Sequence, residues 1–331
     1  GYPAGYGGRL ASVLDIVMED GNMQEYHGSF SIGLISSQAS VQGPIVKNKA
    51  SFLVTGRRTY ADVLLAPITM NMEVKPVFYF YDLTAKLNWQ IDDRNRLYAS
   101  GYLGADKFGA QSISTAAMKM DMGITWGNVT GSLRWNHLWR SNAFSNLTAI
   151  YSSYDLLTFA TIKIANNEFS QTFSSGIQNL GLKYDVNWTQ WEAHTLRFGA
   201  QAIGYKFVPM ASSLKYTKRK IRESAVTALY SIESGVYIED DMRVFDWGRV
   251  NVGLRAAHYG IDNSHSLFIE PRISASAYIT DVFSIKAGYA RMNQNLHLLS
   301  STGVGLPTDL WIPATKKLPP QKAWIASLGL L

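Results

Sequence analysis

Apolar and polar residues alternate over long stretches of this chain. Between Val77 and Ile91 the odd-numbered positions are apolar or aromatic, and the residues between them include Asp82, Lys86 and Asn88. The same period of two recurs in other segments, at 24–34, 118–126, 180–188, 250–255 and 283–290. A period of two places alternate side chains on opposite faces of a β-strand, and no helical stripe competes in these windows. The pattern predicts an all-β protein with long strands.

Short turns separate these segments, and tryptophan lies beside most of the turns. The turns are predicted near Lys47, Asp93, Asn142, Glu192, Asp246 and Thr280. The adjoining tryptophans are Trp89, Trp139, Trp188 and Trp247. Indole rings prefer the boundary between lipid headgroups and hydrocarbon, so tryptophans at one end of the strands are typical of a membrane barrel. We expect these four to form an aromatic belt on the periplasmic side.

Longer connections are predicted between the short turns, over residues 62–76, 105–115, 165–176, 210–223 and 300–321. Outer-membrane barrels have short periplasmic turns and longer exterior loops. Counting between turns gives roughly fourteen strands, several of them long enough for the ~9–11 residues that a tilted strand needs to cross a bilayer. The prediction is a transmembrane antiparallel up-and-down β-barrel, integral to the bacterial outer membrane.

The composition excludes several classes of function. The 331 residues include no cysteine, which excludes thiol catalysis and cysteine-ligated zinc. The hydrophobic content of 47% and mean hydropathy of -0.06 are ordinary, as expected for a barrel in which only alternate residues meet lipid. There is no apolar run of about 18 residues, so a helical membrane protein is not predicted. The net charge of +6 is mild and the aromatics are spread along strands, so no nucleic-acid surface is indicated.

Several motifs occur in a characteristic order. The chain opens with residues 2–16, YPAGYGGRLASVLDI, and continues with GRRTY at 56–60, LRWNH at 133–137, YIEDD at 237–241, EPRIS at 270–274 and YARMNQ at 289–294. In this order and spacing they resemble TonB-dependent outer-membrane receptors, most closely the Bacteroidetes type. The opening segment resembles the end of the plug domain, and the resemblance covers essentially the whole chain.

The resemblance implies a domain organisation and a function. Members of the family have a 22-strand barrel filled by an N-terminal plug. Residues 1–22 are expected to be the C-terminal end of the plug and residues 23–331 to be barrel strands, as an internal segment of a longer receptor. The implied function is TonB-driven import of an unidentified small solute. The implied partners are the TonB complex, reached through a region N-terminal to this segment, membrane lipid with lipopolysaccharide, and a surface lipoprotein lid.

Two other functions fit parts of the pattern. A passive porin or a barrel scaffold in a larger envelope complex would share the strands, and a TonB box upstream would discriminate it from a TonB-dependent importer. A soluble β-propeller or sandwich would bury its apolar faces and would show no layer of tryptophan at the turn ends.

Two groups of charged residues are candidate binding sites. Contacts between plug and wall are predicted for Arg9, Glu239, Asp241, Glu270 and Arg272, since an arginine fork pairs well with carboxylates. Glu239 and Asp241 share one strand face, which is expected to line the lumen. Contact with lipopolysaccharide phosphates or an anionic solute is predicted for a basic exterior loop, and a solvated loop is an equal alternative; its residues are Lys215, Lys218, Arg219, Lys220 and Arg222.

No catalytic chemistry is indicated. The six histidines have none of the spacings of zinc or haem sites, and no nucleophile follows the carboxylates at a recognisable spacing. Met118, Met120 and Met122 alternate on one apolar face, which favours contact with lipid or with the barrel wall over copper binding. We therefore expect no cofactor, no metal site and no enzyme activity.

Overall fold

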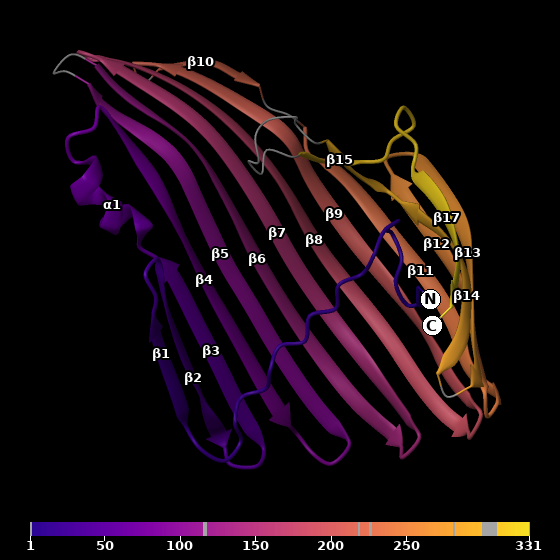
Figure 1. Ribbon diagram of the computed structural model, residues 1–331. Helices are drawn as coiled ribbons and strands as arrows, with labels where there is room; N and C mark the ends of the chain where they lie inside the picture. Colours follow the sequence, from indigo (N-terminus) through magenta and orange to yellow (C-terminus); the bar gives the residue numbers. More distant parts are fainter. Residues whose placement is uncertain are drawn as a thin grey trace.

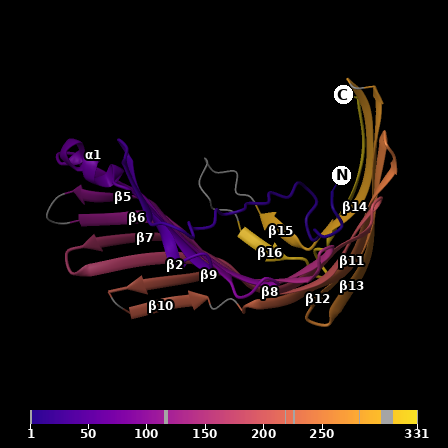
Figure 2. The same ribbon diagram turned by 90° about the horizontal axis from the view of Figure 1, so that it is seen from below.

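The chain folds into one broad, curved sheet in the computed structural model, which describes residues 2–114, 118–217, 219–224, 227–280, 282–299 and 310–330. Figure 1 shows the sheet from its concave side, with the N-terminal segment crossing in front of the strands. Seen from below in Figure 2, the sheet forms an arc whose hollow contains this segment. The arc is the wall of a barrel, and its concave side is the lumen.

The strands are long and follow one another closely. In chain order they are β1 (His27–Ile32), β2 (Ser36–Val46), β3 (Ala50–Thr59), β4 (Val74–Gln90), β5 (Asn95–Ser114), β6 (Met118–Arg140), β7 (Ala143–Ile164), β8 (Asn167–Trp191), β9 (His194–Tyr216), β10 (Arg219–Ser224), β11 (Leu229–Phe245), β12 (Gly248–Ile261), β13 (Ser264–Thr280), β14 (Phe283–Gln294), β15 (Leu296–Leu299), β16 (Leu310–Pro313) and β17 (Gln321–Leu330). A helix, α1 (Ala61–Thr69), separates β3 from β4. In the described ranges no helix has the length and apolar character needed to cross a membrane.

The topology is up-and-down. The main sheet has the order β1-β2-β3-β4-β5-β6-β7-β8-β9-β11-β12-β13-β14-β17, and β10 pairs with the end of β9. β15 and β16 form a separate hairpin that packs over β8 and β9 on the concave side. The antiparallel order confirms the predicted fold, and the main path has the predicted fourteen strands. Within the described residues this sheet is open, with β1 and β17 as its edges.

The two faces of the sheet differ as the alternation predicted. On β4, Leu83 and Trp89 are 47% and 44% exposed on the convex face. Lys86 and Asn88 lie on the opposite face, where the N-terminal segment covers them and leaves 9% and 2% exposed. This part of the wall therefore turns apolar side chains outward and polar side chains inward, as a barrel in lipid with a hydrated interior requires.

The short turns lie together at one end of the sheet, the lower edge of Figure 1. They connect β2 to β3, β4 to β5, β6 to β7, β8 to β9 and β11 to β12. Trp89, Trp139 and Trp247 are 44%, 56% and 52% exposed there, and the ring of Trp188 lies 5.4 Å from that of Trp191. The four predicted belt residues therefore share one end of the wall, while their contact with headgroups stays a prediction.

The turn after β4 shows how the sequence stabilises these connections. The carboxylate of Asp92 accepts hydrogen bonds from the side chain of Asn95 at 2.9 Å and from the backbone N–H groups of Arg94 and Asn95 at 2.8 Å. These bonds, the side-chain bond first, lower the pKa of Asp92 and keep its carboxyl charged at neutral pH.

Three of the predicted long connections are wrong. Residues 105–114 belong to β5, and residues 167–176 belong to β8, which begins after a turn at 165–166. β9 continues to Tyr216, and its last residues pair with β10. As a result β6, β7, β8 and β9 contain 23, 22, 25 and 23 residues, about twice the ~9–11 needed to cross a bilayer. In these extensions the apolar side chains lie on the concave face instead of the convex face. The outward apolar alternation from which the strand ends were predicted therefore stops, although the strands remain paired.

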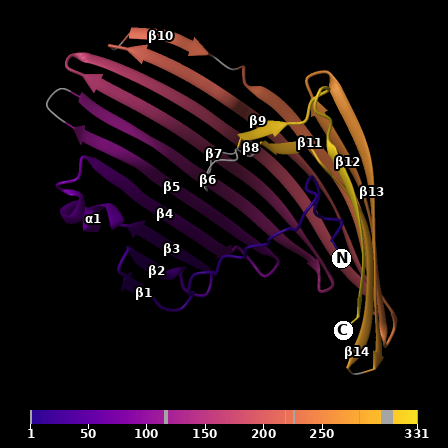
Figure 3. The same ribbon diagram turned by 45° about the horizontal axis from the view of Figure 1, so that its top comes forward.

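The other two predicted connections are partly ordered. The first, 62–76, contains most of α1 before β4 begins at Val74, a helix that period-two analysis did not predict. In the second, 300–321, residues 310–313 form β16, and residues 300–309 lie outside the described part of the chain. Figure 3 shows α1 beside the edge of the sheet, where β4 to β9 extend past the ends of β1 to β3.

Candidate plug-contact cluster on the inner wall

The N-terminal segment binds to the concave wall through its backbone. The side chain of Arg272 on β13 donates hydrogen bonds to the carbonyl oxygens of Pro3 and, at 2.6 Å, Tyr6. The backbone N–H of Ala4 donates to Oε2 of Glu239 on β11 at 2.5 Å, and Arg255 on β12 reaches the carbonyl oxygen of Ala4 at 3.5 Å. Three neighbouring strands therefore hold one short stretch of chain through buried charges.

These charges form a network, which we call the lumen charge cluster: Glu233, Glu239, Arg255, Glu270 and Arg272. Glu270 accepts a 2.8 Å hydrogen bond from Arg272, lies 3.9 Å from Nε of Arg255, and accepts the backbone N–H of Asn293 at 3.1 Å. The cluster residues are only 1–6% exposed. Charges this deeply buried are stable only when paired and hydrogen-bonded, so the cluster and the segment that completes it depend on each other.

Alternation along β11 explains why several of these side chains meet. Glu233, Tyr237, Glu239 and Asp241 are separated by even numbers of residues and project to the concave face. The hydroxyl of Tyr237 donates to Asp185 on β8 at 2.6 Å. Glu233 accepts Nδ2 of Asn295 at 2.8 Å and the hydroxyl of Tyr205 at 3.3 Å. Glu233 was not among the predicted contacts, although its odd position on the strand of Glu239 was an available signal.

Arg255 was not among the predicted contacts either, and its side chain lies directly against Gly7. A Cβ on Gly7 would lie 2.3 Å from Nε of Arg255, so any other residue here would force this buried guanidinium or the segment to move. Gly8 has a φ of +73° and its missing side chain leaves room for Glu233. The backbone at Gly7 and Gly8 therefore lies directly against the cluster.

Only some of the predicted contact residues lie in the cluster. Glu239, Glu270 and Arg272 lie in the lumen charge cluster, while Arg9 bonds the carbonyl oxygen of Gly8 at 2.7 Å and interacts electrostatically with Glu233. Asp241 shares the lumen face as predicted, but its partner is Arg249 at 3.9 Å, and it lines a cavity of about 560 Å³ at the short-turn end.

A second attachment point lies on the far side of the lumen. Lys86 on β4 forms a 2.7 Å ion pair with Asp20 and also bonds the carbonyl oxygen of Met18. Asn88 donates to Asp20 at 3.3 Å. Residues 2–20 therefore span the concave face from β13 to β4, attached at both ends (Figure 1).

The aromatic rings of the segment contact basic side chains of the wall. The guanidinium of Arg272 lies 4.6 Å from the ring centroid of Tyr2, and Nζ of Lys183 lies 5.2 Å from that of Tyr6. Burial raises the pKa of both tyrosines, so they stay neutral and hold these cations through their rings.

The predicted basic loop is a hairpin rather than an irregular connection. Lys215 lies on β9, and Arg219, Lys220 and Arg222 lie on β10, where Lys220 pairs with Lys215. Lys218 lies outside the described residues. The hairpin stands at the end of the sheet opposite the short turns (Figure 1), and its binding of phosphates stays a prediction.

The site therefore binds and positions a chain segment. No group of three or more histidine, aspartate or glutamate side chains in the described residues is arranged to hold a metal ion. His258, near the end of β12, and His265, at the start of β13, have ring nitrogens 3.1 Å apart, and the other ring nitrogen of His258 lies 3.4 Å from the hydroxyl of Ser234. The cluster offers charge pairing and hydrogen bonds. Glu239 and Glu270 are bonded by arginine and backbone donors, and Glu233 is bonded by the side chains of Asn295 and Tyr205.

The wall is a curved antiparallel sheet that is apolar outside, and buried charges hold a chain segment inside it. These features define the class of protein as a transmembrane barrel with a lumenal insert. The family model described as "TonB dependent receptor-like, beta-barrel" matches residues 55–330. The chain therefore belongs to the TonB-dependent receptor barrel family, whose members are transport receptors integral to the outer membrane. A comparison with curated proteins gives no match.

Solved structures of receptors share this fold. The siderophore receptor PirA from Acinetobacter baumannii is 17% identical with a TM-score of 0.60, covering 93% of this chain and 50% of that one. The ferric yersiniabactin uptake receptor FyuA from Yersinia pestis is 13% identical with a TM-score of 0.61, covering 94% and 51%. A mutant of the ferric enterobactin receptor PfeA from Pseudomonas aeruginosa is 16% identical with a TM-score of 0.58, covering 94% and 51%. The chain thus spans about half the length of these relatives, and the similarity shows the fold alone.

Proposed function

We propose that this chain is the plug end and part of the barrel wall of a TonB-dependent importer in the outer membrane. A solute binds at the exterior side, and TonB, acting from the periplasm, displaces the plug so that the solute passes. The observation that carries the proposal is the segment at residues 2–20, which crosses the lumen and is held at both ends by the wall. A passive pore has no need of such an insert.

The domain division follows from this proposal. Residues 1–22 close the plug, and residues 23–331 contribute barrel strands. The resemblance of residues 2–16 supports a receptor of the Bacteroidetes type, for which a surface lipoprotein lid is an additional proposed partner. Lipopolysaccharide is the proposed partner of the Lys215 hairpin.

The solute that we propose is a ferric siderophore. Support comes from the structural relatives, which are named as siderophore and ferric siderophore receptors. The full receptor in its own host is tested with a panel of siderophores loaded with radioactive iron. Uptake in energised cells that disappears on deletion of TonB supports import. Uptake that survives the deletion indicates a passive pore instead.

The role of the lumenal segment has a separate test. A Cβ added at Gly253 would lie 2.8 Å from Cβ of Ala4, so a small shift brings an A4C/G253C pair to the ~3.8 Å spacing of a disulfide. This chain has no other cysteine. Oxidation of the pair is expected to stop uptake and reductant to restore it, with each single variant as control. Full uptake through the oxidised pair would contradict plug displacement at this contact.

A further inference from the structure

We propose that His258 and His265 form a binding site for a divalent transition metal, with Cu²⁺ as the preferred ion, on the convex face of the wall. His258 lies near the end of β12 and His265 at the start of β13, on either side of a turn at residues 262–263. This turn is at the end of the wall opposite the short turns, which the proposed function assigns to the exterior. The site takes nothing else from the proposed function.

Strand register places both imidazole rings on the convex face. Directly paired residues of antiparallel strands project to the same side of a sheet. His258 pairs with Leu267, which is 80% exposed. His265 pairs with Gly260, which is two residues beyond His258 on β12. The buried side chain of Arg255 faces the lumen and is an odd number of residues from His258, so the two project to opposite faces.

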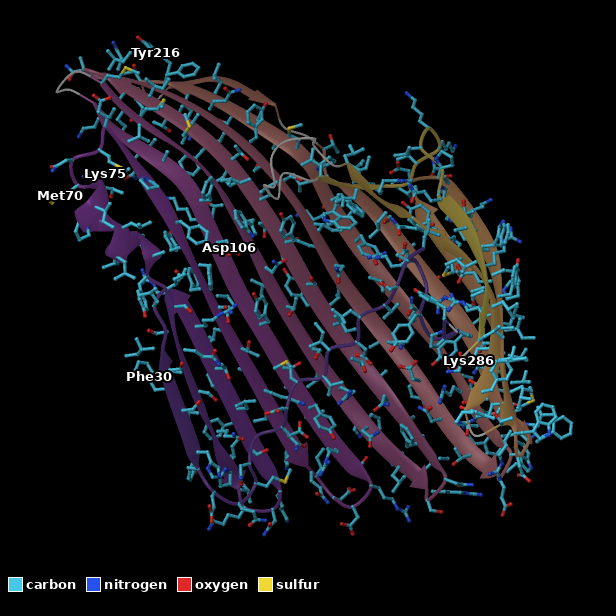
Figure 4. The ribbon with its side chains drawn as sticks, in the orientation of Figure 1. Phe30, Met70, Lys75, Asp106, Tyr216 and Lys286 are labelled. Atoms are coloured by element: carbon cyan, nitrogen blue, oxygen red, sulfur yellow. The ribbon has the colours of Figure 1, made fainter. Side chains whose placement is uncertain are left out.

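The convex face is the outer side of the barrel wall, so a plug or a solute in the lumen does not cover it. Figure 4 shows side chains that project outward along this right-hand part of the wall, next to the labelled Lys286 of β14. His265 is exposed on this face and His258 is half-buried. An ion in the surrounding solution therefore reaches both rings.

The two rings hold a pair of nitrogen atoms at the separation of neighbouring ligands of one metal ion. Nε2 of His258 lies 3.1 Å from Nδ1 of His265. Imidazole nitrogens bind these metals at about 2.0–2.1 Å, so two neighbouring nitrogens of a square-planar or tetrahedral ion are about 2.9–3.4 Å apart. The rings are inclined by 19° with centroids 5.3 Å apart, so the edges that carry these nitrogens face each other.

Ser234 orients the ring of His258 from the neighbouring strand. The two residues are directly paired, and the hydroxyl of Ser234 lies 3.4 Å from Nδ1 of His258. With the Nδ1 proton donated to this hydroxyl, Nε2 of His258 carries a lone pair that faces His265. The hydrogen bond between the rings then uses the Nδ1 proton of His265, and a metal replaces this bond when that proton shifts to Nε2 of His265. Metal-binding histidines typically donate the second ring N–H to an oxygen in this way.

Gly260 leaves the space in which the two rings meet. A Cβ at Gly260 would lie 3.2 Å from Nδ1 of His265 and 3.3 Å from Cε1 of His258, which is closer than such atoms normally approach. A larger side chain at this position would therefore move the rings apart.

The ligand set selects the ion. Neutral imidazole nitrogens suit Cu²⁺, Ni²⁺ and Zn²⁺, whereas Ca²⁺ and Mg²⁺ require oxygen ligands, and affinity among the first three is highest for Cu²⁺. In the described ranges no group of three or more histidine, aspartate or glutamate side chains could hold a metal, so water completes the coordination. No metal site was expected from the sequence, because a spacing of seven residues matches no metal motif, whereas the hairpin brings the two rings together.

The test measures Cu²⁺ binding to the full receptor, purified without a polyhistidine tag and freed of metal by a chelator. Calorimetric titration with Cu²⁺ gives the affinity, and electron paramagnetic resonance at one equivalent of Cu²⁺ reports the number of bound imidazoles. The unaltered receptor is expected to bind the first equivalent through two imidazole nitrogens. H258N and H265N are each expected to lower the affinity by at least about tenfold and to leave one imidazole in the spectrum.

Three further variants separate this site from general binding to histidine. H27N removes a histidine from β1 and is expected to change neither affinity nor spectrum. S234A removes the hydroxyl beside His258 and is expected to lower the affinity by less than H258N, with two imidazoles still bound. G260V keeps both ligands and is expected to weaken binding because it separates the rings. All variants must keep the mobility of the folded barrel on unheated gels.

Other results overturn the proposal. A spectrum with one imidazole in the unaltered receptor, or an affinity that H258N and H265N leave unchanged, places the copper elsewhere. A loss in H27N equal to that in H265N shows general binding to surface histidines, and full binding by G260V shows that the rings do not meet over Gly260. None of these measurements involves TonB or uptake, so the metal site and import can fail separately.

Discussion

Removing the carboxylate of Glu270 is the sharpest test of the lumen charge cluster. Glu270→Ala leaves the guanidinium groups of Arg255 and Arg272 without their shared partner, at positions where both side chains are 2–3% exposed. It also removes the acceptor of the Asn293 backbone N–H. Breaking a buried ion pair from one side costs about 3–5 kcal/mol, and we expect a loss of that size in the free energy of unfolding.

The matched control is an exposed pair on the same wall. Arg57 and Asp82 are 2.7 Å apart, but Arg57 is 48% exposed, so D82A is expected to cost about 0–1 kcal/mol. Both variants are measured in the full receptor by urea unfolding in lipid, followed by tryptophan fluorescence. Adding R272M to E270A is expected to recover part of the loss, since the second change removes one stranded charge.

The result that refutes this reasoning is equal stability. If E270A and D82A differ by less than about 1 kcal/mol, water reaches Arg255 and Arg272 and the cluster is not a buried network. A double variant that is simply additive would show that Glu270 and Arg272 act independently.

Three further outcomes are expected. V129K on the lipid-facing side of β6, near the middle of the ~9–11-residue crossing that begins at Trp135, should cost about 2–4 kcal/mol in lipid unfolding measurements, whereas T130K on the lumen side should cost far less; equal costs would contradict the assignment of faces. G7V should release the N-terminal segment, because its side chain overlaps Arg255, and should make residues near 10–20 sensitive to protease while the barrel keeps its folded mobility on unheated gels. Trp247 fluorescence should be quenched by lipids brominated near the headgroup, whereas Trp126, on the inward face, should not respond; the reverse would remove Trp247 from the belt.

Local pattern determined much of this fold in advance. The alternation from Val77 to Ile91 predicted β4 and its two faces, because a strand projects successive side chains to opposite sides whatever its neighbours are. The short turns followed from residues such as Asp92, whose side chain bonds the backbone two and three residues on. Glu239, Glu270 and Arg272 were predicted as contacts between plug and wall from their charges, and Glu239 also from its inward strand position.

The pairing of strands determined which side chains meet in the cluster, and the local sequence pattern did not contain this information. Arg255 joins the cluster because β12 lies beside β13, and Glu233 joins it because Asn295 and Tyr205 arrive from distant parts of the chain. The same pairing shows that apolar side chains such as Phe108 and Met122 turn to the concave face in the long extensions of β4 to β9. Alternation shows that the two faces of a strand differ. Which face meets lipid and which meets the lumen depends on the neighbouring strands and on the position along the strand, and both are properties of the assembled sheet.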